Sequence, residues 1–374
     1  MNNKYNKKLH VVSFDVPFPP DYGGVIDVFF KIRALTRLGF RITLHCWHYG
    51  RELASQELES ICEEVIYYKR NRFKNPFTGP MPYIVKTRVS DELVKNLRKD
   101  QAPVLFEGLH TTAPLFFDEL KDRTVVVRNH NIESDYYRLL AEKEGGSFKK
   151  TYFRQEAKSL KSYEDVLGRA DYVASISIKD HEALSKRFNS VYVPAFHPNE
   201  EVSVGSNYED YCLYHGNLAV GENNEAALFL ANEVFTRLPY KLIIAGNRAS
   251  AQLKEVCAGR ENIEIRENLK VEEFDDLISH ARINVLPTFQ NTGIKLKLIN
   301  ALFKGGHCVV NDEMVKDSGL ESLCVIANGA EEFVDQIKKV YTKSFQNGSI
   351  EKRKQVLESS FSNEHSAKLL AKLF

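Results

Sequence analysis

The segment INVLPTFQNTGIKLKLINALFKGGHCVV, residues 283–310, holds an apolar run, a polar loop, a helix-like run and a second apolar run. The two apolar runs, 283–286 and 307–310, have the length of buried strands. Between them, residues 294–304 repeat apolar side chains at helical spacing and end at a pair of glycines. This order predicts a strand–loop–helix–strand unit with two parallel strands and a right-handed crossover.

The start of the predicted helix in this segment has the features of an anion site. A helix that begins beside a glycine, directly after a strand, offers free backbone N–H groups and the positive end of its dipole. Gly293 and Ile294 stand at that start, and Lys295 and Lys297 add positive charge. Taken alone, the segment fits a phosphate site and a plain turn with solvated lysines equally well.

The bulk composition is that of a globular protein with two domains. A chain of 374 residues is too long for one ordinary core, and 43% hydrophobic with 27% charged residues is typical of soluble proteins. The formal net charge of +1 gives no strong attraction to nucleic acid. Six scattered cysteines without a Cys-x-x-Cys pair indicate a reducing compartment and no zinc site. With no run of about 20 apolar residues, we expect a cytoplasmic protein.

The chain opens with the pattern of a nucleotide-binding α/β sheet. Residues 10–14 form a predicted strand, 25–38 an amphipathic helix with Lys31 facing outward, and 41–47 the next strand. Before the helix, Gly23 and Gly24 end a turn that brings the backbone close to a ligand. No GxGxxG motif is present, so a bound dinucleotide is not expected.

Polar side chains follow two further strands of this half. The strand that ends at residue 106 is followed by Glu107 and His110, and the strand that ends at 127 is followed by His130 and Glu133. The carboxyl ends of parallel strands meet at one edge of a sheet, where ligands bind. The pattern predicts a polar site there, although each residue alone also fits a strand-end cap.

The second half repeats the architecture after a linker at residues 197–210. Its predicted strands alternate with helices and cover residues 211–214, 241–245, 263–265, 283–286, 307–310 and 323–327. Two α/β halves of similar size, facing a shared crevice, are the expected architecture.

Three segments of the second half together resemble the retaining glycosyltransferases of family 4. They are Tyr214-His215-Gly216-Asn217-Leu218, Lys241-Leu242-Ile243-Ile244-Ala245-Gly246, and the stretch from His280 to Val310. In the first half, Pro20-Asp21-Tyr22-Gly23-Gly24 resembles a loop near the donor phosphates, and Asn129-His130-Asn131-Ile132-Glu133 resembles a strand end of the acceptor domain.

The resemblance implies an α/β protein of the GT-B type, with two Rossmann-like doubly wound domains facing a central cleft. Residues 1–197 would bind the acceptor, residues 198–358 the nucleotide-sugar donor, and the helix at 359–374 would pack back on the first domain. It also implies metal-independent transfer with retention from a UDP- or GDP-sugar, with no other cofactor, to a glycan, polysaccharide or lipid-linked acceptor. The absence of an Asp-x-Asp motif agrees with the expectation of no metal site.

The resemblance also implies roles for the residues of this chain that match the family's functional positions. His130 would lie beside the reacting sugar, and Glu107 and His110 are candidates on the acceptor side. The donor-binding candidates are Gly23, Gly24, Gly216, Asn217, Gly246, Asn247, Glu267, Asn268, Thr292, Gly293, Ile294, Lys295 and Asn300.

The chain departs from the family pattern at the donor phosphates. The family's two glutamates fall on Thr292 and Asn300, and its Arg and Lys fall on Asn217 and Glu222. Lys295 is the expected replacement charge. An active transferase is the primary interpretation, and a nucleotide-sugar-binding or partner subunit without catalysis, or a nucleotide-sugar epimerase, are the alternatives.

A basic and aromatic stretch offers a contact with a lipid-linked acceptor. It comprises Lys69, Arg70, Arg72, Phe73, Lys74 and Phe77. We therefore expect peripheral contact with the inner face of the membrane and no nucleic-acid partner.

Overall fold

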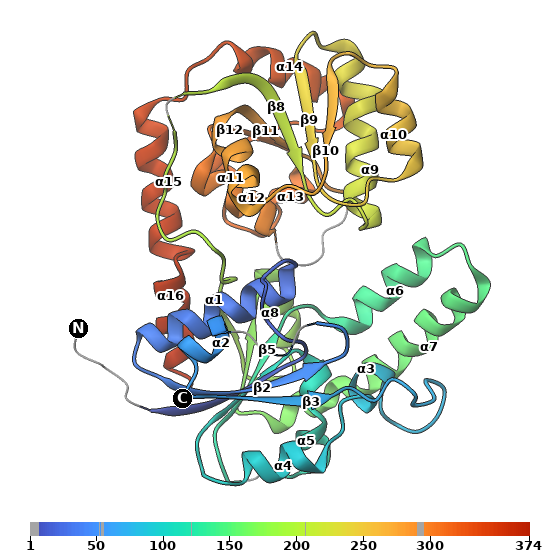
Figure 1. The fold of residues 1–374 in the computed structure, drawn as a ribbon, viewed down its shortest axis with the longest axis vertical. Coiled ribbons are helices and arrows are strands. Elements are labelled where there is room, and N and C mark those ends of the chain that lie inside the picture. The colour runs from blue at the N-terminus through green and yellow to red at the C-terminus, as the bar shows by residue number, and fades with distance from the viewer. Residues whose placement is uncertain (1–6, 52, 54–55, 121, 206, 290–294) are drawn as a thin grey trace. The chain divides into compact units, whose positions relative to one another are not determined.

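The computed structural model describes residues 7–51, 53, 56–120, 122–205, 207–289 and 295–374. The chain divides into two compact units, drawn in Figure 1. The N-terminal unit takes in the described residues up to Pro198 together with Asn363–Phe374. The C-terminal unit takes in the described residues from Asn199 to Ser362.

The N-terminal unit is built on a parallel sheet whose described strands run in the order β3-β2-β1-β4-β5-β6-β7. The strands are β1 (Lys8–Ser13), β2 (Arg41–His48), β3 (Glu64–Lys69), β4 (Val104–Glu107), β5 (Val125–Asn129), β6 (Tyr172–Ser175) and β7 (Ser190–Tyr192). The helices are α1 (Gly23–Arg37), α2 (Gln56–Ile61), α3 (Tyr83–Lys86), α4 (Asp91–Leu97), α5 (Ala113–Phe116), α6 (Glu133–Lys143), α7 (Ser147–Tyr163), α8 (Ile178–Leu184) and α16 (Asn363–Ala371).

The C-terminal unit repeats this design, with the described strands of its parallel sheet in the order β10-β9-β8-β11-β12-β13. The strands are β8 (Glu209–His215), β9 (Lys241–Ala245), β10 (Ile263–Arg266), β11 (Ala281–Leu286), β12 (His307–Val310) and β13 (Val325–Ile326). The helices are α9 (Gly221–Phe229), α10 (Ala251–Ala258), α11 (Val271–His280), α12 (Leu296–Lys304), α13 (Asp312–Val315), α14 (Gly329–Tyr341) and α15 (Asn347–Ser360).

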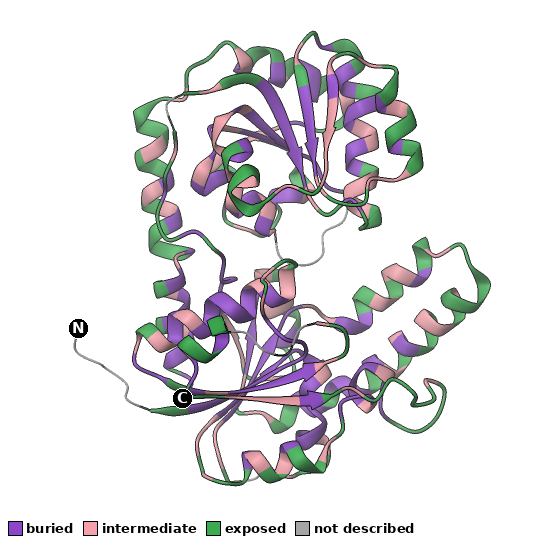
Figure 2. Cartoon of the chain, viewed as in Figure 1, coloured by how far each residue is buried: buried purple, intermediate pink, exposed green. Residues whose placement is uncertain are grey.

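Burial explains why these segments are strands. In β1, Leu9 and Val11 pack into one apolar cluster, while Val12 packs into the cluster on the opposite face of the sheet. Alternate side chains of a strand point to opposite faces, so a sheet covered by helices on both faces needs apolar residues throughout. Figure 2 shows the strands of both sheets as mostly buried.

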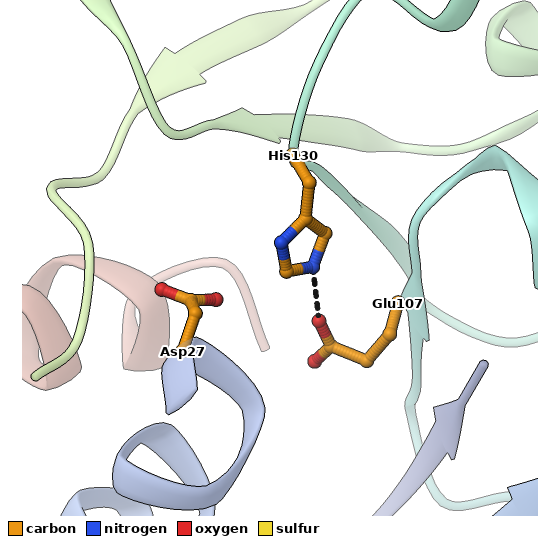
Figure 3. A group of neighbouring side chains, drawn as sticks. All are labelled: Asp27, Glu107 and His130. Carbon is orange, nitrogen blue, oxygen red and sulfur yellow. Dashed lines mark hydrogen bonds and ion pairs between the residues drawn. The ribbon is translucent and has the colours of Figure 1, made fainter. Parts of the chain in front are cut away.

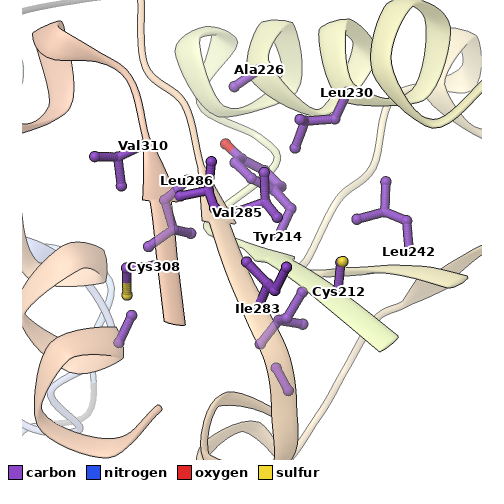
Figure 4. Packing of buried hydrophobic residues seen from close by; sticks show 14 of the residues in the cluster. Cys212, Tyr214, Ala226, Leu230, Leu242, Ile283, Val285, Leu286, Cys308 and Val310 are labelled. Atoms are coloured by element: carbon purple, nitrogen blue, oxygen red, sulfur yellow. The ribbon is translucent and has the colours of Figure 1, made fainter. Parts of the chain in front are cut away.

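The core of the C-terminal unit lies between its sheet and the helices around it. Ile283, Val285 and Leu286 of β11 pack with Tyr214 of β8 and with Leu230, which follows α9 (Figure 4). The apolar runs of the opening segment are therefore the central strands of this sheet. The predicted unit of strand, helix and strand is confirmed as β11, α12 and β12.

Both sheets contain the Rossmann strand order 3-2-1-4-5-6, which β7 extends in the N-terminal sheet, so the prediction of two doubly wound domains is confirmed. In such sheets, ligands bind beyond the carboxyl ends of the strands where the order reverses. That point lies between β1 and β4 in the N-terminal unit and between β8 and β11 in the C-terminal unit.

The described helices are all too short or too polar to form a segment that crosses a bilayer.

Candidate functional site

The carboxyl edge of the N-terminal sheet carries a buried charge network of Asp27, Lys31, Glu107, Arg128 and His130. Asp27 and Lys31 lie one turn apart on α1, and the Lys31 ammonium donates to Asp27 Oδ2 at 2.7 Å and to Glu107 Oε2 at 2.8 Å. The side chains of Asp27, Lys31, Glu107 and Arg128 are fully buried, and His130 is 6% exposed. Charges so buried are stable only when they are paired and hydrogen-bonded.

The Arg128 guanidinium closes the network at its other end. It donates to Asp27 Oδ1 at 3.0 Å and to the backbone oxygens of Val193 and Pro194 at 2.6 and 3.0 Å. Burial alone would raise the pKa of Asp27, but Arg128 and Lys31 hold it well below its usual value. Asp27 therefore stays ionised and holds both cations in place.

His130 is oriented by Glu107. Its Nε2 lies 3.0 Å from Glu107 Oε2, as Figure 3 shows. When Nε2 carries the ring proton and donates a hydrogen bond to Glu107, Nδ1 of the neutral ring is a hydrogen-bond acceptor. The described residues provide no hydrogen-bond partner for Nδ1 of His130 or for Oε1 of Glu107. Buried polar atoms seldom lack partners, so these two atoms have hydrogen-bonding capacity that the described residues leave unused.

Ligand atoms of Asp27, Glu107 and His130 lie within 4.8 Å of one another, which is close enough to share a metal ion. However, Lys31 already donates to both carboxylates and Arg128 to one of them. A divalent cation would meet two buried positive charges there. The arrangement is therefore better suited to an ion-pair network than to a metal centre.

His110 and Glu133 lie at the same sheet edge but outside this network. The Phe14 ring is 5.5 Å from the His110 ring and 5.4 Å from the His130 ring. Burial, with Arg88 and His130 nearby, holds the pKa of His110 well below its usual value. Burial and Asp180 raise the pKa of Glu133 to about 8, against the opposing effect of Arg88. At neutral pH, Glu133 is therefore largely protonated and can donate a hydrogen bond.

Two expectations for α1 need correction. Lys31, predicted to face solvent, is fully buried because its ammonium bonds Asp27 and Glu107. Gly23 and Gly24, predicted to end a loop, are the first residues of the helix. A Cβ on Gly24 would lie 2.7 Å from the Phe14 ring, so the close approach of that ring requires glycine. Both backbone amides lie in the first turn, where no intrahelical acceptor exists.

The carboxyl edge of the C-terminal sheet is formed by loops in close contact. A Cβ on Gly246, after β9, would lie 1.8 Å from the backbone oxygen of Gly216, after β8. Asn217 Oδ1 accepts from the Ala219 amide at 3.1 Å, and Asn247 Oδ1 accepts from the Asn268 amide at 2.7 Å. These predicted donor residues thus hold the strand-end loops together.

Glu267 and Asn300 have partners within the C-terminal unit. The Glu267 carboxylate accepts from the Ala249 amide at 3.0 Å and lies 2.7 Å from the Lys254 ammonium. Asn300 Oδ1, on α12, accepts from the Asn199 side chain at 2.8 Å. Their predicted roles in donor binding stay predictions, as do those of Thr292, Gly293 and Ile294, which lie outside the described residues.

The first turn of α12 holds a lysine that the list of predicted site residues lacked. The Lys297 ammonium donates to Asn223 Oδ1 at 2.8 Å and lies 5.4 Å from the centre of the Tyr214 ring. Burial lowers the pKa of Lys297 to about 8; Glu222 opposes this shift, whereas Lys295 adds to it. Lys295 is the N-cap residue of the helix, and no acidic residue lies in the first turn.

Glu222 lies close to this lysine. Its carboxylate accepts a hydrogen bond from the hydroxyl of Thr288, which lies two residues after β11. The acid thus lies at the strand-end edge of the unit, where the resemblance implies a basic residue. Lys297 supplies positive charge close to this acid.

The sequence pattern could not reveal the most buried of these residues. Asp27, Lys31 and Arg128 are charged residues in apolar segments, and their spacing alone does not show which strands they meet. The one available signal was the i, i+4 spacing of Asp27 and Lys31 on a helix that packs against the sheet.

Comparisons with known proteins match part of the chain to a family and most of the chain to one relative. Residues 209–343 match the family described as Glycosyl transferases group 1. An "Uncharacterized 44.6 kDa protein in cps region" of Klebsiella pneumoniae is 26% identical over 319 residues, which cover 79% of this chain and 80% of that protein.

Solved structures share the fold over nearly the whole chain. Sucrose-phosphate synthase from Thermosynechococcus elongatus superposes with a TM-score of 0.68 at 12% identity, over 98% of both chains. A glycosyltransferase from Rickettsia africae gives a TM-score of 0.65 at 13% identity, over 99% of this chain and 98% of that one. The protein is a glycosyltransferase with a GT-B fold of two Rossmann-like domains.

Proposed function

We propose that the protein transfers a sugar from a UDP- or GDP-sugar to a glycan, polysaccharide or lipid-linked acceptor, with retention of anomeric configuration and without a metal ion. The observation that carries this proposal is the pair of lysines at the start of α12. Two cations at the positive end of a helix repel each other and the dipole, and a bound diphosphate would relieve that repulsion.

The reaction depends most on positive charge that the protein places beside the leaving diphosphate. As the bond between sugar and diphosphate breaks, negative charge grows on the leaving phosphate oxygens, and fixed donors stabilise it. Lys297 is suited to this task because burial and its hydrogen bond to Asn223 limit its motion. Lys295 and backbone amides of the first turn would contribute further donors, so the transfer we propose uses no metal ion.

The N-terminal network would act on the sugar. With Nε2 held by Glu107, His130 would offer Nδ1, which has no partner among the described residues, to a hydroxyl of the ligand. Glu107, held by Lys31, keeps the ring in one orientation. Glu133 and His110, both largely uncharged at neutral pH, are suited to hydrogen-bond the hydroxyls of an acceptor.

The setting of the reaction is also a proposal. The Klebsiella relative is described as a protein of the cps region, which supports a role in polysaccharide biosynthesis. We place the reaction in the cytoplasm, at the inner face of the membrane when the acceptor is lipid-linked.

Calorimetric titration with UDP-, GDP- and ADP-sugars tests the donor site. One nucleotide class should bind saturably, and Lys297→Ala should weaken it about ten- to hundredfold, the worth of a hydrogen bond to a charged group. Lys295→Ala should weaken it less, and Lys338→Ala, at an exposed site on α14, should have no effect. Equal affinity in all four proteins would rule out this site for the diphosphate.

A further inference from the structure

An unusual number of aromatic side chains face solvent on the N-terminal unit. Among the described residues, five phenylalanines are exposed, and four belong to this unit. They are Phe73 (101% exposed), Phe77 (49%), Phe117 (51%) and Phe148 (75%). Exposed apolar groups that cluster in this way mark an interaction site rather than ordinary surface.

These rings belong to one surface. The Phe77 ring, in the loop of residues 70–82, lies 6.5 Å from the Phe148 ring at the start of α7. The same loop contributes Lys74 and Pro80 to a hollow of about 280 Å³ that is also lined by Val89 and Phe117. We call Phe73, Phe77, Val89, Phe117 and Phe148 the aromatic surface.

Hydrogen bonds hold the loop in place while its rings face water. The Lys86 ammonium donates to the backbone oxygens of Asn75 (2.9 Å) and Thr78, and the Tyr83 hydroxyl donates to that of Arg72 (2.8 Å). The loop is therefore braced from α3, the helix that follows it.

Helix α3 is in turn tied to α7. The buried Glu156 carboxylate accepts from the amides of Tyr83 and Ile84 at 3.0 and 2.9 Å. The loop and α7 thus present their phenylalanines as one prearranged surface, which reduces the entropy lost on binding. Figure 1 shows α7 beside α6 as a pair of helices extending from this unit.

The loop that carries Phe73 and Phe77 is rich in positive charge. Residues 69–89 contain six basic and no acidic residues, although the whole chain carries a net charge of only +1. Beside Phe148, α7 adds Lys149 and Lys150. Arg72, Lys74 and Lys149 are exposed, and the described residues provide no ion-pair partner for them.

We propose that the aromatic surface docks the protein on an anionic lipid bilayer, with the phenylalanine rings at the boundary of headgroups and acyl chains. Apolar rings framed by Lys and Arg are the combination that binds this interface. The purpose of the contact, access to a lipid-linked acceptor, rests on the proposed function. The binding itself does not, and it is measurable without donor or acceptor.

Other occupants fit less well. A second copy would bring the same basic residues face to face, where like charges repel. A nucleic acid would use the positive charge and could stack on the rings, but it would leave Val89 and the apolar hollow unused. Both alternatives are outcomes of the test below.

Flotation of the full chain with vesicles tests the proposal, using phosphatidylcholine alone and phosphatidylcholine mixed with phosphatidylglycerol. Binding should require the anionic lipid and weaken with added salt. Each basic residue near an anionic bilayer raises the partition coefficient of a protein onto the vesicles about fivefold. The triple variant Arg72→Glu/Lys74→Glu/Lys149→Glu should therefore lower this partition coefficient more than about a hundredfold. Phe73→Ser/Phe148→Ser should also release the protein.

Matched controls lie in the C-terminal unit. Val271→Ser removes an apolar side chain that is 73% exposed, and Lys338→Glu reverses an exposed charge. Both should float like the wild type, and all variants should keep the wild-type circular dichroism and nucleotide-sugar titration. The proposal would be overturned if no protein floated with the vesicles, or if equal amounts floated with both kinds of vesicle. It would also be overturned if the aromatic-surface variants floated like the wild type. Two other results would also overturn it. One is concentration-dependent dimerisation that the aromatic-surface variants abolish. The other is binding of single-stranded RNA, in place of vesicles, that the same variants abolish.

Discussion

At the scale of single residues, Lys297 has the role that is most directly testable. Its ammonium is held between Asn223 and the Tyr214 ring, and burial lowers its pKa to about 8. A lysine with a lowered pKa is fully charged only below that value. Its attraction for an anion is therefore present at neutral pH and lost as the pH rises through about 8.

Nucleotide-sugar affinity should therefore fall as the pH rises from 7 to 9.5. A diphosphate joined to two groups keeps its charge over this range, so a slope that the Lys297→Met variant lacks reports the lysine. Calorimetric titration across that range measures the effect. Lys297→Met should bind weakly at every pH and show no such slope, and a wild-type affinity that is flat above pH 8 would contradict the assignment.

The buried Lys31 has a different role, because it neutralises two carboxylates. Removing one partner from a buried ion pair costs about 3–5 kcal/mol, since the remaining charge is left without compensation. Lys31→Met should lower the free energy of unfolding by about that amount in urea denaturation. Lys95→Met, at an exposed site on α4, should change it by less than about 0.5 kcal/mol. Equal effects of the two changes would mean that Lys31 does not carry the network.

Charged residues of this kind set the limit of sequence reasoning. Arg128 and Lys31 stand in apolar segments as polar interruptions, and helical or strand spacing assigns such residues to solvent. Only the packing of α1 against β4 and β5 shows that they meet Asp27 and Glu107. His130 and Glu107 were found because both follow strands at the same sheet edge.

At the scale of elements, the loops after β8 and β9 lie so close together that one position between them admits only glycine. A Cβ on Gly246 would lie 1.8 Å from the backbone oxygen of Gly216, so one loop must move to accept it. Gly246→Ala should cost about 1–3 kcal/mol of stability, as overpacking does. It should also weaken nucleotide-sugar binding, because Gly216 precedes the loop that meets Asn223.

Gly259→Ala is the matched control, since a Cβ there would meet no atom within 4 Å. Thermal unfolding and titration of the two variants separate the effects. Similar melting temperatures and affinities for both would contradict the close approach of the two loops.

Strands with continuous apolar runs were predictable, and elements with polar sequences were not. The runs at 241–245 and 307–310 match β9 and β12 in both bounds. Helix α15 was missed because NGSIEKRKQVLESS is almost entirely polar. Its place in the fold depends on Arg353, whose buried guanidinium donates to the backbone oxygens of Gly305 and Gly306 after α12. Such caps depend on tertiary contacts that local pattern does not encode.

At the scale of the whole molecule, two sheets of the same topology each present a distinct chemistry at the carboxyl edge. The N-terminal edge carries the network around His130, and the C-terminal edge carries lysines at the start of α12. The first suits a hydroxylated sugar and the second an anionic leaving group. These are the two tasks of the transfer from a nucleotide sugar that we propose.

The most direct test of this account is a product analysis by NMR. The nucleotide sugar that binds in calorimetry is incubated with the protein, first alone and then with a panel of free and lipid-linked oligosaccharides. We predict release of the nucleoside diphosphate, slowly to water and faster to one acceptor, with the donor's anomeric configuration kept in the product. His130→Ala should lower the rate at least about a hundredfold, as expected for a group that acts on the reacting sugar. A folded protein that binds the donor but never consumes it, or that releases only an epimerised nucleotide sugar, would contradict the account.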